Sequence, residues 1–366
     1  MKNKNISAED ISAFNGKKIN VALIGVGSFT KALVEGVAFY TKHPEERIGL
    51  MNPKIGPYEV RHINFVAAFD VDERKVGKKL HDAISAGPNI TKQIARPLIY
   101  DALVYRGPTL DSVHDAMRKS FVHESSMAAV DIAQTLKASQ ATMVLNFLPS
   151  GGEQATYAYA EAALKAGCSF INCIPTSLAA LPEWTERFTK KGLVLLGDDI
   201  KSQLGATMLN RILLEFLKMR GIRVVKSEQE NKGGNADHFN LLYRAKAKEK
   251  SKREALTHFL EKGDARPTVK FLYTGTPSGH KKVTITVEGE MFGRVPLSIV
   301  SVIEDEISIN GAGVVVDAIR IAQLLLDMEK QKDAWKSCPF LMKSPLHPLS
   351  DAEAFKAFNE LVRALR

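Results

Sequence analysis

The stretch Lys18–Tyr40, KINVALIGVGSFTKALVEGVAFY, joins an apolar run, a glycine turn and an apolar-periodic segment. This order predicts a buried strand, a tight turn and a helix. Gly25 permits the tight turn, Gly27 lets a pyrophosphate approach the backbone, and the amides that open the helix attract its charge. Thr30 stands where the dinucleotide fingerprint has its third glycine, so the motif is incomplete. Its place between a strand and a helix nevertheless indicates a dinucleotide site.

The next predicted strand, His62–Asp72, brings a carboxylate to its end at Asp70. In dinucleotide-binding folds, an acid about 20 residues after the motif binds the ribose hydroxyls. Asp70 lies farther than this from the glycine motif. The segment Thr41–Val60 is rich in turn-forming residues and reads as a loop inserted before the strand, which accounts for the extra length. We therefore predict that Asp70 binds ribose. The alternative is a solvated acid in a turn at the end of a strand.

Strands and helices keep alternating to about residue 200, which predicts a parallel sheet with helices on both faces. After Leu213, segments of alternating apolar and polar residues read as antiparallel strands, and two predicted helices follow. The predicted fold class is α/β, a Rossmann-type doubly wound parallel sheet with an inserted α+β domain. We place the Rossmann domain with the C-terminal helices at residues 1–207 and 309–366, and the inserted domain at residues 208–308.

The 366-residue chain carries a formal net charge of +9 and has a pI of about 9.2. A generally basic surface, a nucleic-acid partner and a site for an anionic small molecule all fit this charge. Three cysteines are too few for a disulfide framework, and the first residues lack the apolar segment of a secretory signal. No segment reads as a bilayer span. We expect a cytoplasmic protein in a reducing compartment.

Charged residues gather where a predicted strand meets a predicted helix, in the segment Gly197–Thr207, GDDIKSQLGAT. Farther on, Lys248 and Lys252 are four residues apart, so on a helix they share one face, where like charges repel. An anion between them would remove this cost, and a solvated helical face is the alternative. Lys343 is the only charge in the segment FLMKSP, where a snorkelling lysine is the alternative to a functional one.

Several long segments, spread over nearly the whole chain, resemble those of the myo-inositol-1-phosphate synthase family. Chance similarity of so many specific segments is very improbable. In chain order they are GVG, GLMNPKIGPYEVRHINFVAAFDVDERKVG, RGPTLD, LPSGGEQA, AGCSFINCIP, GDDIKSQLGAT, GGNADHFNLL, VEGEMFGRVP, AGVVVDAIR and LMKSP.

The resemblance implies NAD-dependent cyclisation of a hexose 6-phosphate, glucose 6-phosphate to myo-inositol 1-phosphate. C5 is oxidised, the ketone acidifies C6, the enolate attacks the C1 aldehyde, and the ring ketone is reduced. Each step moves negative charge onto an oxygen, where preorganised ammonium groups stabilise it. The resemblance further implies that the inserted domain serves catalysis and oligomerisation. We expect a homotetramer with a small-molecule substrate and without nucleic-acid or membrane partners.

The resemblance also implies roles for individual residues. The implied catalytic residues are Lys248, Lys343, Lys281, Lys201 and Asp199. The implied substrate-binding residues are Lys252, Ser202, Gln203, Asn235, Asp237 and, for a match shifted by one residue from Lys281, Lys282. The implied NAD-binding residues are Gly25, Val26, Gly27, Ser28, Phe29, Thr30, Asp70, Asn146, Leu148 and Asp199. The sequence assigns no residue to a metal.

The chain departs from the family pattern at a few positions. Gly279 and Ile307 stand where the family usually has acids, although Asp305 and Glu306 lie just before Ile307, and Ala247 replaces a usual serine. The lysines implied by the resemblance are present, whereas the neighbouring acids are not. This combination fits a different sugar phosphate, so a related synthase that forms a five-membered cyclitol phosphate from fructose 6-phosphate is one alternative. A simple NAD-dependent sugar-phosphate dehydrogenase is another. A catalytically inactive descendant that binds nucleic acid or has a regulatory role is the third.

Overall fold

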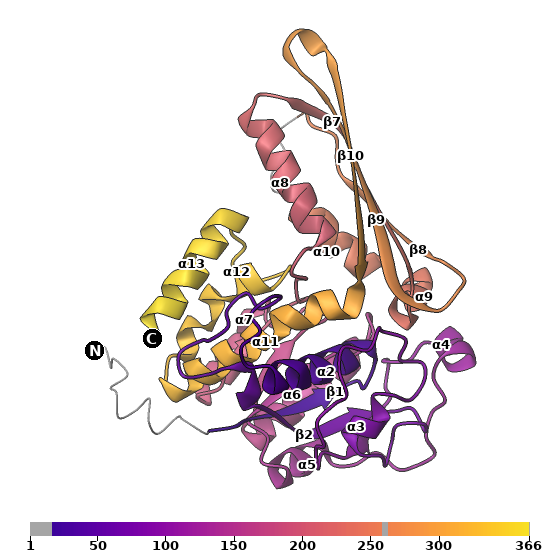
Figure 1. The fold of residues 1–366 in the computed structure, drawn as a ribbon, viewed down its shortest axis with the longest axis vertical. Coiled ribbons are helices and arrows are strands. Elements are labelled where there is room, and N and C mark those ends of the chain that lie inside the picture. The colour runs from indigo at the N-terminus through magenta and orange to yellow at the C-terminus, as the bar shows by residue number, and fades with distance from the viewer. Residues whose placement is uncertain (1–16, 258–262, 366) are drawn as a thin grey trace.

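The computed structural model describes residues 17–257 and 263–365, without the side chains at positions 247, 248, 250, 251, 254 and 255. Two sheets organise the chain, one in the broad lower body of Figure 1 and one in the tall upper part. Helices cover the lower sheet, and the helix α8 stands beside the upper one (Figure 1). The predicted α/β fold class is confirmed.

The lower sheet has six parallel strands in the order β3-β2-β1-β4-β5-β6. The strands are β1 (Ile19–Ile24), β2 (Ile63–Asp70), β3 (Val104–Arg106), β4 (Met143–Asn146), β5 (Ser169–Asn172) and β6 (Leu195–Leu196). The winding reverses between β1 and β4, and ligands of such sheets bind beyond the carboxyl ends of the strands at the reversal. The predicted doubly wound sheet is therefore confirmed, and Gly25 follows β1 at its reversal point.

Helices pack on both faces of this sheet, as the alternation predicts. One face shares a core with α2 (Ser28–Lys42), α11 (Ile307–Asp327), α12 (Cys338–Leu341) and α13 (Asp351–Ala364). The other face is covered by α5 (Ile132–Ala138), α6 (Glu153–Ala166) and α7 (Pro182–Lys190). The remaining short helices of this body are η1 (Val60–His62), α3 (Leu80–Ala83), α4 (Asp115–Ser120) and η3 (Gln331–Lys336).

Helix α11 is the one helix of the described residues that is long and apolar enough to cross a membrane, but 78% of its apolar window is buried in the protein. Its residues Asp317 and Arg320 form a fully buried ion pair. Arg320 also donates to the carbonyls of Asn52 and Pro53, in the loop before β2. The helix is thus a core element, and its charged residues hold the inserted loop against the core.

The upper sheet has the strand order β10-β9-β7-β8. Its strands are β7 (Arg223–Gly234), β8 (Thr268–Tyr273), β9 (Ser278–Glu290) and β10 (Pro296–Glu306), with the turn η2 (Phe292–Arg294) joining the last two. β9 runs antiparallel to β7 and β10, but β8 runs parallel to β7. The prediction of antiparallel strands is therefore wrong for β8. The chain crosses over through α9 (Ala236–Arg244) and α10 (Lys246–Thr257), and such a crossover joins parallel strands.

Helix α8 (Ala206–Met219) leads from the lower sheet to the upper one and packs against its inner face. β9 turns apolar side chains to this side, whereas β7 turns Ser227, Gln229 and Asn231 to it, all of them buried. Buried strand positions are mostly apolar, so this polar row indicates the wall of a site. The second sheet and its helices span residues 206 to 306. The division into two domains at 207/208 and 308/309 stays a prediction.

Candidate active site

A cavity of about 280 Å³ lies where the carboxyl edge of the lower sheet meets the upper sheet. Gly27, Phe147 and Cys173, which follow β1, β4 and β5, line it from below. Asn231 of β7 and Lys281 of β9 line it from the upper sheet. The cavity thus lies at the reversal of the strand order, where sheets of this kind bind ligands.

The two acids in the segment that begins at Gly197 have different surroundings. Asp198 is fully buried, and its carboxylate accepts the amides of residues 178–180 at 2.9 to 3.0 Å and the Asn172 side chain at 2.7 Å. Burial raises the pKa of this carboxyl to about 6, although these hydrogen bonds lower it. Asp198 therefore ties together the loops after β5 and β6, and its role is structural.

Asp199, in contrast, lines the cavity and has a φ of +61°, which is uncommon for a residue with a side chain. Its Oδ1 accepts a 2.7 Å hydrogen bond from Lys343 Nζ, which also donates to the Ile200 carbonyl at 2.6 Å. Its Oδ2 is buried and has no hydrogen-bond partner among the described residues. A strained backbone and an unpartnered buried oxygen at a cavity are typical of a ligand site.

Lys201 lies along the cavity wall and reaches the C-terminal helix. Its Nζ donates to the Pro339 carbonyl at 2.8 Å and to Asp351 Oδ1 at 3.1 Å. Arg211 Nε lies 3.1 Å from the other oxygen of Asp351. Burial lowers the pKa of Lys201, while the charge of Asp351 raises it. The structure thus brings the predicted Lys201 to the cavity, together with Arg211 and Asp351.

Two more predicted lysines line the cavity, Lys252 from α10 and Lys281 from β9. Lys252 Nζ donates to Asn231 Oδ1 at 2.7 Å and lies 4.7 Å from the centre of the Phe271 ring. Lys281 Nζ lies 3.2 Å from Asp305 Oδ1. Both lysines are buried, so each ammonium group is held in a defined direction at the cavity.

The structure does not bring Lys282 to the cavity. Successive residues of a strand face opposite sides, so Lys282 is exposed on the outer face of β9, where it pairs with Glu304 at 2.9 Å. Of the two registers left open by the sequence, the one with Lys281 at the cavity is therefore the one observed. Lys248 falls within α10, and its side chain lies outside the described part of the chain.

The turn before α8 forms a part of the cavity wall that suits an anion. Ser202 and Thr207 line the cavity, and α8 begins after Gly205 without a side-chain cap. An uncapped helix start presents amides that suit a phosphate. The predicted Gln203 does not line the cavity. Its side chain donates instead to the Gly49 carbonyl at 2.5 Å.

Asn235 and Asp237 line the cavity at the start of α9. Asn235 caps the helix by accepting the His238 amide at 2.9 Å. Ser150 Oγ, in the loop after β4, donates to Asp237 at 3.3 Å. These contacts hold α9 against the lower sheet, and both predicted residues lie at the cavity.

The glycine turn fits a dinucleotide. Gly25 has a φ of +84°, and a Cβ at this position would lie 2.8 Å from the Phe147 carbonyl oxygen, so a larger residue is excluded. Nothing lies within 4 Å of where a Cβ at Gly27 would be, so the approach to the backbone is open. Helix α2 then begins without a side-chain cap, and Ser28 and Phe29 line the cavity. These uncapped amides suit a pyrophosphate.

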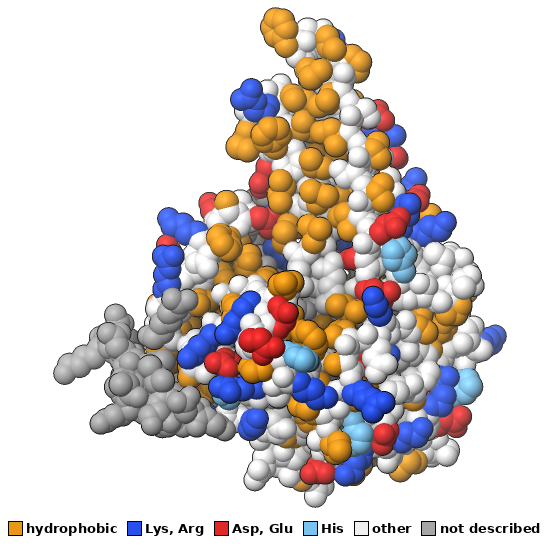
Figure 2. Space-filling view, viewed as in Figure 1, with side chains coloured by type: hydrophobic (Ala, Val, Ile, Leu, Met, Phe, Trp, Pro, Cys, Tyr) orange, Lys and Arg blue, Asp and Glu red, His pale blue; other side chains and the backbone are white. Residues whose placement is uncertain are grey.

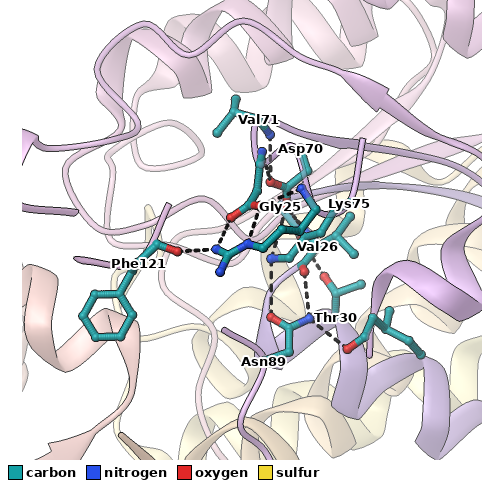
Figure 3. Close-up of polar contacts among 11 residues, drawn as sticks. Gly25, Val26, Thr30, Asp70, Val71, Lys75, Asn89 and Phe121 are labelled. Carbon is teal, nitrogen blue, oxygen red and sulfur yellow. Dashed lines mark hydrogen bonds and ion pairs between the residues drawn. The ribbon is translucent and has the colours of Figure 1, made fainter. Parts of the chain in front are cut away.

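Asp70 lies against the same turn, as Figure 3 shows. Its carboxylate accepts the amides of Val26 and Val71 at 2.7 Å each and that of Asp72 at 2.9 Å. Lys75 Nζ is 3.8 Å from the same carboxylate. Asp70 therefore fixes the orientation of the glycine turn. Binding of ribose by this carboxylate stays a prediction.

The other predicted cofactor residues divide into two groups. Leu148 and Asp199 line the cavity with Gly27, Ser28 and Phe29. Gly25, Val26, Thr30, Asp70 and Asn146 make contacts behind them. Thr30 Oγ1 donates to the Gly25 carbonyl, and the fully buried Asn146 accepts the Leu148 amide at 3.1 Å.

Known proteins are similar in sequence to this chain over nearly its whole length. The inositol-3-phosphate synthase of Corynebacterium glutamicum is 40% identical over 346 residues, which cover 91% of this chain and 95% of that protein. The chain belongs to the myo-inositol-1-phosphate synthase family. The family model for myo-inositol-1-phosphate synthase matches residues 205–305. An inositol-3-phosphate synthase of Mycobacterium tuberculosis is 37% identical over 356 residues, covering 94% of this chain and 96% of that protein.

Solved structures have the same overall arrangement. The crystal structure of Ari2 has a TM-score of 0.77 and 30% identity, covering 95% of this chain and 99% of that one. A myo-inositol-1-phosphate synthase-related protein from Thermotoga maritima has a TM-score of 0.75 at 21% identity, covering 94% of this chain and 98% of that one, which shows a shared fold.

Two acids that the family pattern leads us to expect at Gly279 and Ile307 are absent, and β10 brings carboxylates close to both positions. Asp305 pairs with Lys281 beside the cavity. A Cβ at Gly279 would collide with the carboxylate of Glu306. Glycine at this position therefore makes room for an acid that comes from the neighbouring strand.

Sequence reasoning missed several residues that line the cavity, among them Arg211, Asn231, Phe271 and Asp351. Arg211 follows Thr207 by about one helical turn, and Asn231 continues the buried row of β7, so helix and strand periodicity could have indicated both. Asp351 is 150 residues from its partner Lys201, and no local pattern connects the two.

Proposed function

We propose that this member of the family is an NAD-dependent isomerase that cyclises glucose 6-phosphate to myo-inositol 1-phosphate. The observation that carries the proposal is that Lys201, Lys252, Lys281 and Lys343 line one cavity with Gly27 of the glycine turn. A sugar phosphate that passes through alkoxide and enolate forms needs such cations around its oxygens. Identities of 40% and 37% over most of the chain to named inositol-3-phosphate synthases support the same activity.

The residues around Asp199 would serve the reacting carbons. NAD held at the glycine turn would supply hydride acceptance at C5 and hydride return after ring closure. Lys343 would stabilise the sugar oxygen that becomes an alkoxide, because its ammonium is held 2.7 Å from Asp199. The unpartnered Oδ2 of Asp199 would accept a hydrogen bond from a sugar hydroxyl. Lys248 would share the proton transfers with Lys343.

Other groups that line the cavity would hold the phosphate and the C1 oxygen. Lys252 and Lys281 supply buried cations, and the turn from Ser202 to Thr207 supplies amides at a helix start. Anchoring the sugar at both ends would bring C6 and C1 together, which converts ring closure into a well-oriented intramolecular step.

Product analysis tests the proposal. Purified protein is incubated with NAD and glucose 6-phosphate or, separately, fructose 6-phosphate, and the products are identified by NMR and mass spectrometry. We expect an inositol phosphate from glucose 6-phosphate, with no net NADH because the hydride is returned. NADH formed in step with substrate loss would instead identify a simple dehydrogenase.

A five-membered cyclitol phosphate from fructose 6-phosphate is the second candidate. It is favoured by Gly279 and Ile307, because the carboxylates near these positions come from β10 in this chain. A carboxylate that enters from another direction suits a different hydroxyl pattern. A cyclised product from fructose 6-phosphate alone would select this candidate.

We also propose a homotetramer that forms through the upper sheet. Figure 2 shows hydrophobic side chains gathered over the upper part of the molecule. Exposed apolar residues of this part are Ile212, Phe216 and Met219 on α8 and Val300 and Val302 on β10. Apolar patches of this kind commonly mark an interface.

We further propose a cytoplasmic location. Cys168, Cys173 and Cys338 are buried free thiols, as in proteins of reducing compartments.

A further inference from the structure

We propose that Asp351, the first residue of the C-terminal helix α13, positions Lys201 and Arg211 at the cavity, so that the last helix of the chain is part of the active site. The inference rests on the proposed function and adds a positioning residue to it. Asp351 forms an ion-pair cluster with these two residues, which lie about 140 to 150 residues earlier in the chain.

Asp351 uses both of its carboxylate oxygens. Oδ1 lies 3.1 Å from Lys201 Nζ, and Oδ2 lies 3.1 Å from Arg211 Nε. Each of the two cationic residues is only 7% exposed, and all three residues line the cavity. Two buried cations so close together repel each other, and the carboxylate between them compensates this repulsion. Removing it would leave two buried positive charges without a shared partner.

The position of Asp351 is itself well defined. Ser350 and Glu353 form a capping box that fixes the start of α13, while Phe358 and Leu361 anchor the helix in the core. Functional groups on a packed helix are held more accurately than groups on a loop. The carboxylate is therefore a fixed point from which the two cations can be directed.

Backbone carbonyls of the C-terminal segment before α13 also bind the same two cations. Lys201 Nζ donates to the Pro339 carbonyl at 2.8 Å, and Arg211 Nη2 donates to the Leu349 carbonyl at 3.2 Å. Each cation thus contacts both Asp351 and a carbonyl of the C-terminal segment. The C-terminal segment determines where both of them point.

The charges around Lys201 influence its pKa, which an experiment can follow. Burial is the strongest influence and lowers the pKa of Lys201; Asp351 of α13 raises it, and Arg211 of α8 and Lys343, after α12, lower it. Burial raises the pKa of Glu215, also on α8, and the charge of Asp351 raises it further. Without the charge of Asp351, Lys201 should lose its proton at lower pH.

The test compares Asp351→Asn with Glu360→Gln, which removes an exposed acid from the same helix. For Asp351→Asn we expect kcat to fall on the order of 10- to 100-fold. KM for glucose 6-phosphate should change much less, and the alkaline limb of the kcat profile should move to lower pH. Asp351→Glu should restore part of kcat, and Glu360→Gln should match the wild type throughout.

A second readout follows Lys201 without turnover. Limited acetylation of the full-length protein, followed by peptide mapping, reports the fraction of neutral amine at Lys201. We expect faster acetylation of Lys201 in Asp351→Asn than in the wild type or Glu360→Gln. If the wild type yields no cyclised product, the proposed function fails, and this readout still decides the positioning role.

Several outcomes would overturn the inference. One is wild-type kcat and wild-type Lys201 acetylation in Asp351→Asn. Another is a loss of kcat with an unmoved alkaline limb and no recovery in Asp351→Glu, which would indicate a merely structural role. Should Asp351→Asn fail to fold, Lys201→Gln/Asp351→Asn is compared with Lys201→Gln. Equal kcat supports the inference, and a further large loss in the double variant contradicts it.

Discussion

The contact between Lys343 and Asp199 joins two segments that are 144 residues apart in the chain. The amide of Lys343 donates to the Asp199 carbonyl at 2.8 Å, and its ammonium returns to the carboxylate of the same residue. The pair is therefore held by backbone as well as side chain. This leaves the direction of the ammonium group defined at the cavity, as a group that stabilises developing charge must be.

Replacing Lys343 by alanine should lower kcat about 100- to 1000-fold, because one preorganised cation at the reacting oxygen is lost. Circular dichroism should remain unchanged. Lys336→Ala, which removes a half-exposed lysine paired with Asp333, should keep full activity. Full activity in Lys343→Ala would refute its catalytic role.

Lys281 and Lys282 provide a matched pair for the upper sheet. Lys281→Met should lower kcat/KM by about 100-fold, because a buried cation at the cavity is lost. Lys282→Met changes the same residue type one position along, on the exposed face, and should stay within about twofold. Steady-state kinetics with glucose 6-phosphate measures both. The reverse order of effects would show that the register of β9 at the cavity is different.

At the scale of elements, the loop after β2 supports the glycine turn through Asp72, which lies two residues beyond Asp70. Asp72 accepts the amide of Arg74 at 2.9 Å and its Nε at 2.8 Å. Burial would raise the pKa of Asp72, but the hydrogen bonds and charge of Arg74 outweigh it and leave the pKa below its ordinary value. An acid with a lowered pKa stabilises the folded state above its unfolded pKa, and this contribution is lost as pH falls through the folded one.

Asp72→Asn should therefore lower the free energy of unfolding at pH 7 by about 1 to 3 kcal/mol, because buried donors lose a charged acceptor. The difference from the wild type should begin to shrink as the pH falls below the ordinary aspartate pKa of about 4, and it should keep shrinking through the lower pKa of Asp72 in the folded state. Denaturant unfolding at several pH values measures it. Asp101→Asn, at a fully exposed acid paired with Lys79, is the control. A difference that grew toward acid would contradict the assignment.

The elements differ in how well the sequence predicted them. The strand, turn and helix around Gly25 were predictable because the apolar periods and glycines are local. The parallel pairing of β8 was not, because the crossover contains α10, whose lysines read as a solvated charge run rather than as part of a connection. The pairs that complete the site, such as Asp305 with Lys281, depend on register between strands. The sequence of either strand alone does not specify that register.

At the scale of the whole molecule, α8 and the upper sheet expose large apolar side chains. Phe216 and Met219 of α8 are 56% and 75% exposed, and Val300 of β10 is 62% exposed. The cavity lies at the end of this sheet that meets the lower body, where Lys281 and Asn231 line it. An assembly that covers the sheet would therefore also hold these two residues in place.

The protein should elute with about four times the 40.3 kDa mass of one chain in size-exclusion chromatography with light scattering. Phe216→Glu combined with Val300→Lys should reduce that mass, because charges on an apolar interface are costly to bury. Glu360→Gln, on α13, should leave the mass unchanged. A monomeric wild type at micromolar concentration would contradict the proposed tetramer.

The central claim is that oxidation, ring closure and reduction take place in the cavity that Gly27 lines together with Lys201, Lys252, Lys281 and Lys343. Glucose 6-phosphate that carries deuterium at C5 tests it directly. The hydride removed from C5 is returned before the product leaves, so NMR and mass spectrometry should find an inositol phosphate that keeps its deuterium. Deuterium recovered in released NADH, with an open-chain keto sugar as the product, would contradict the account.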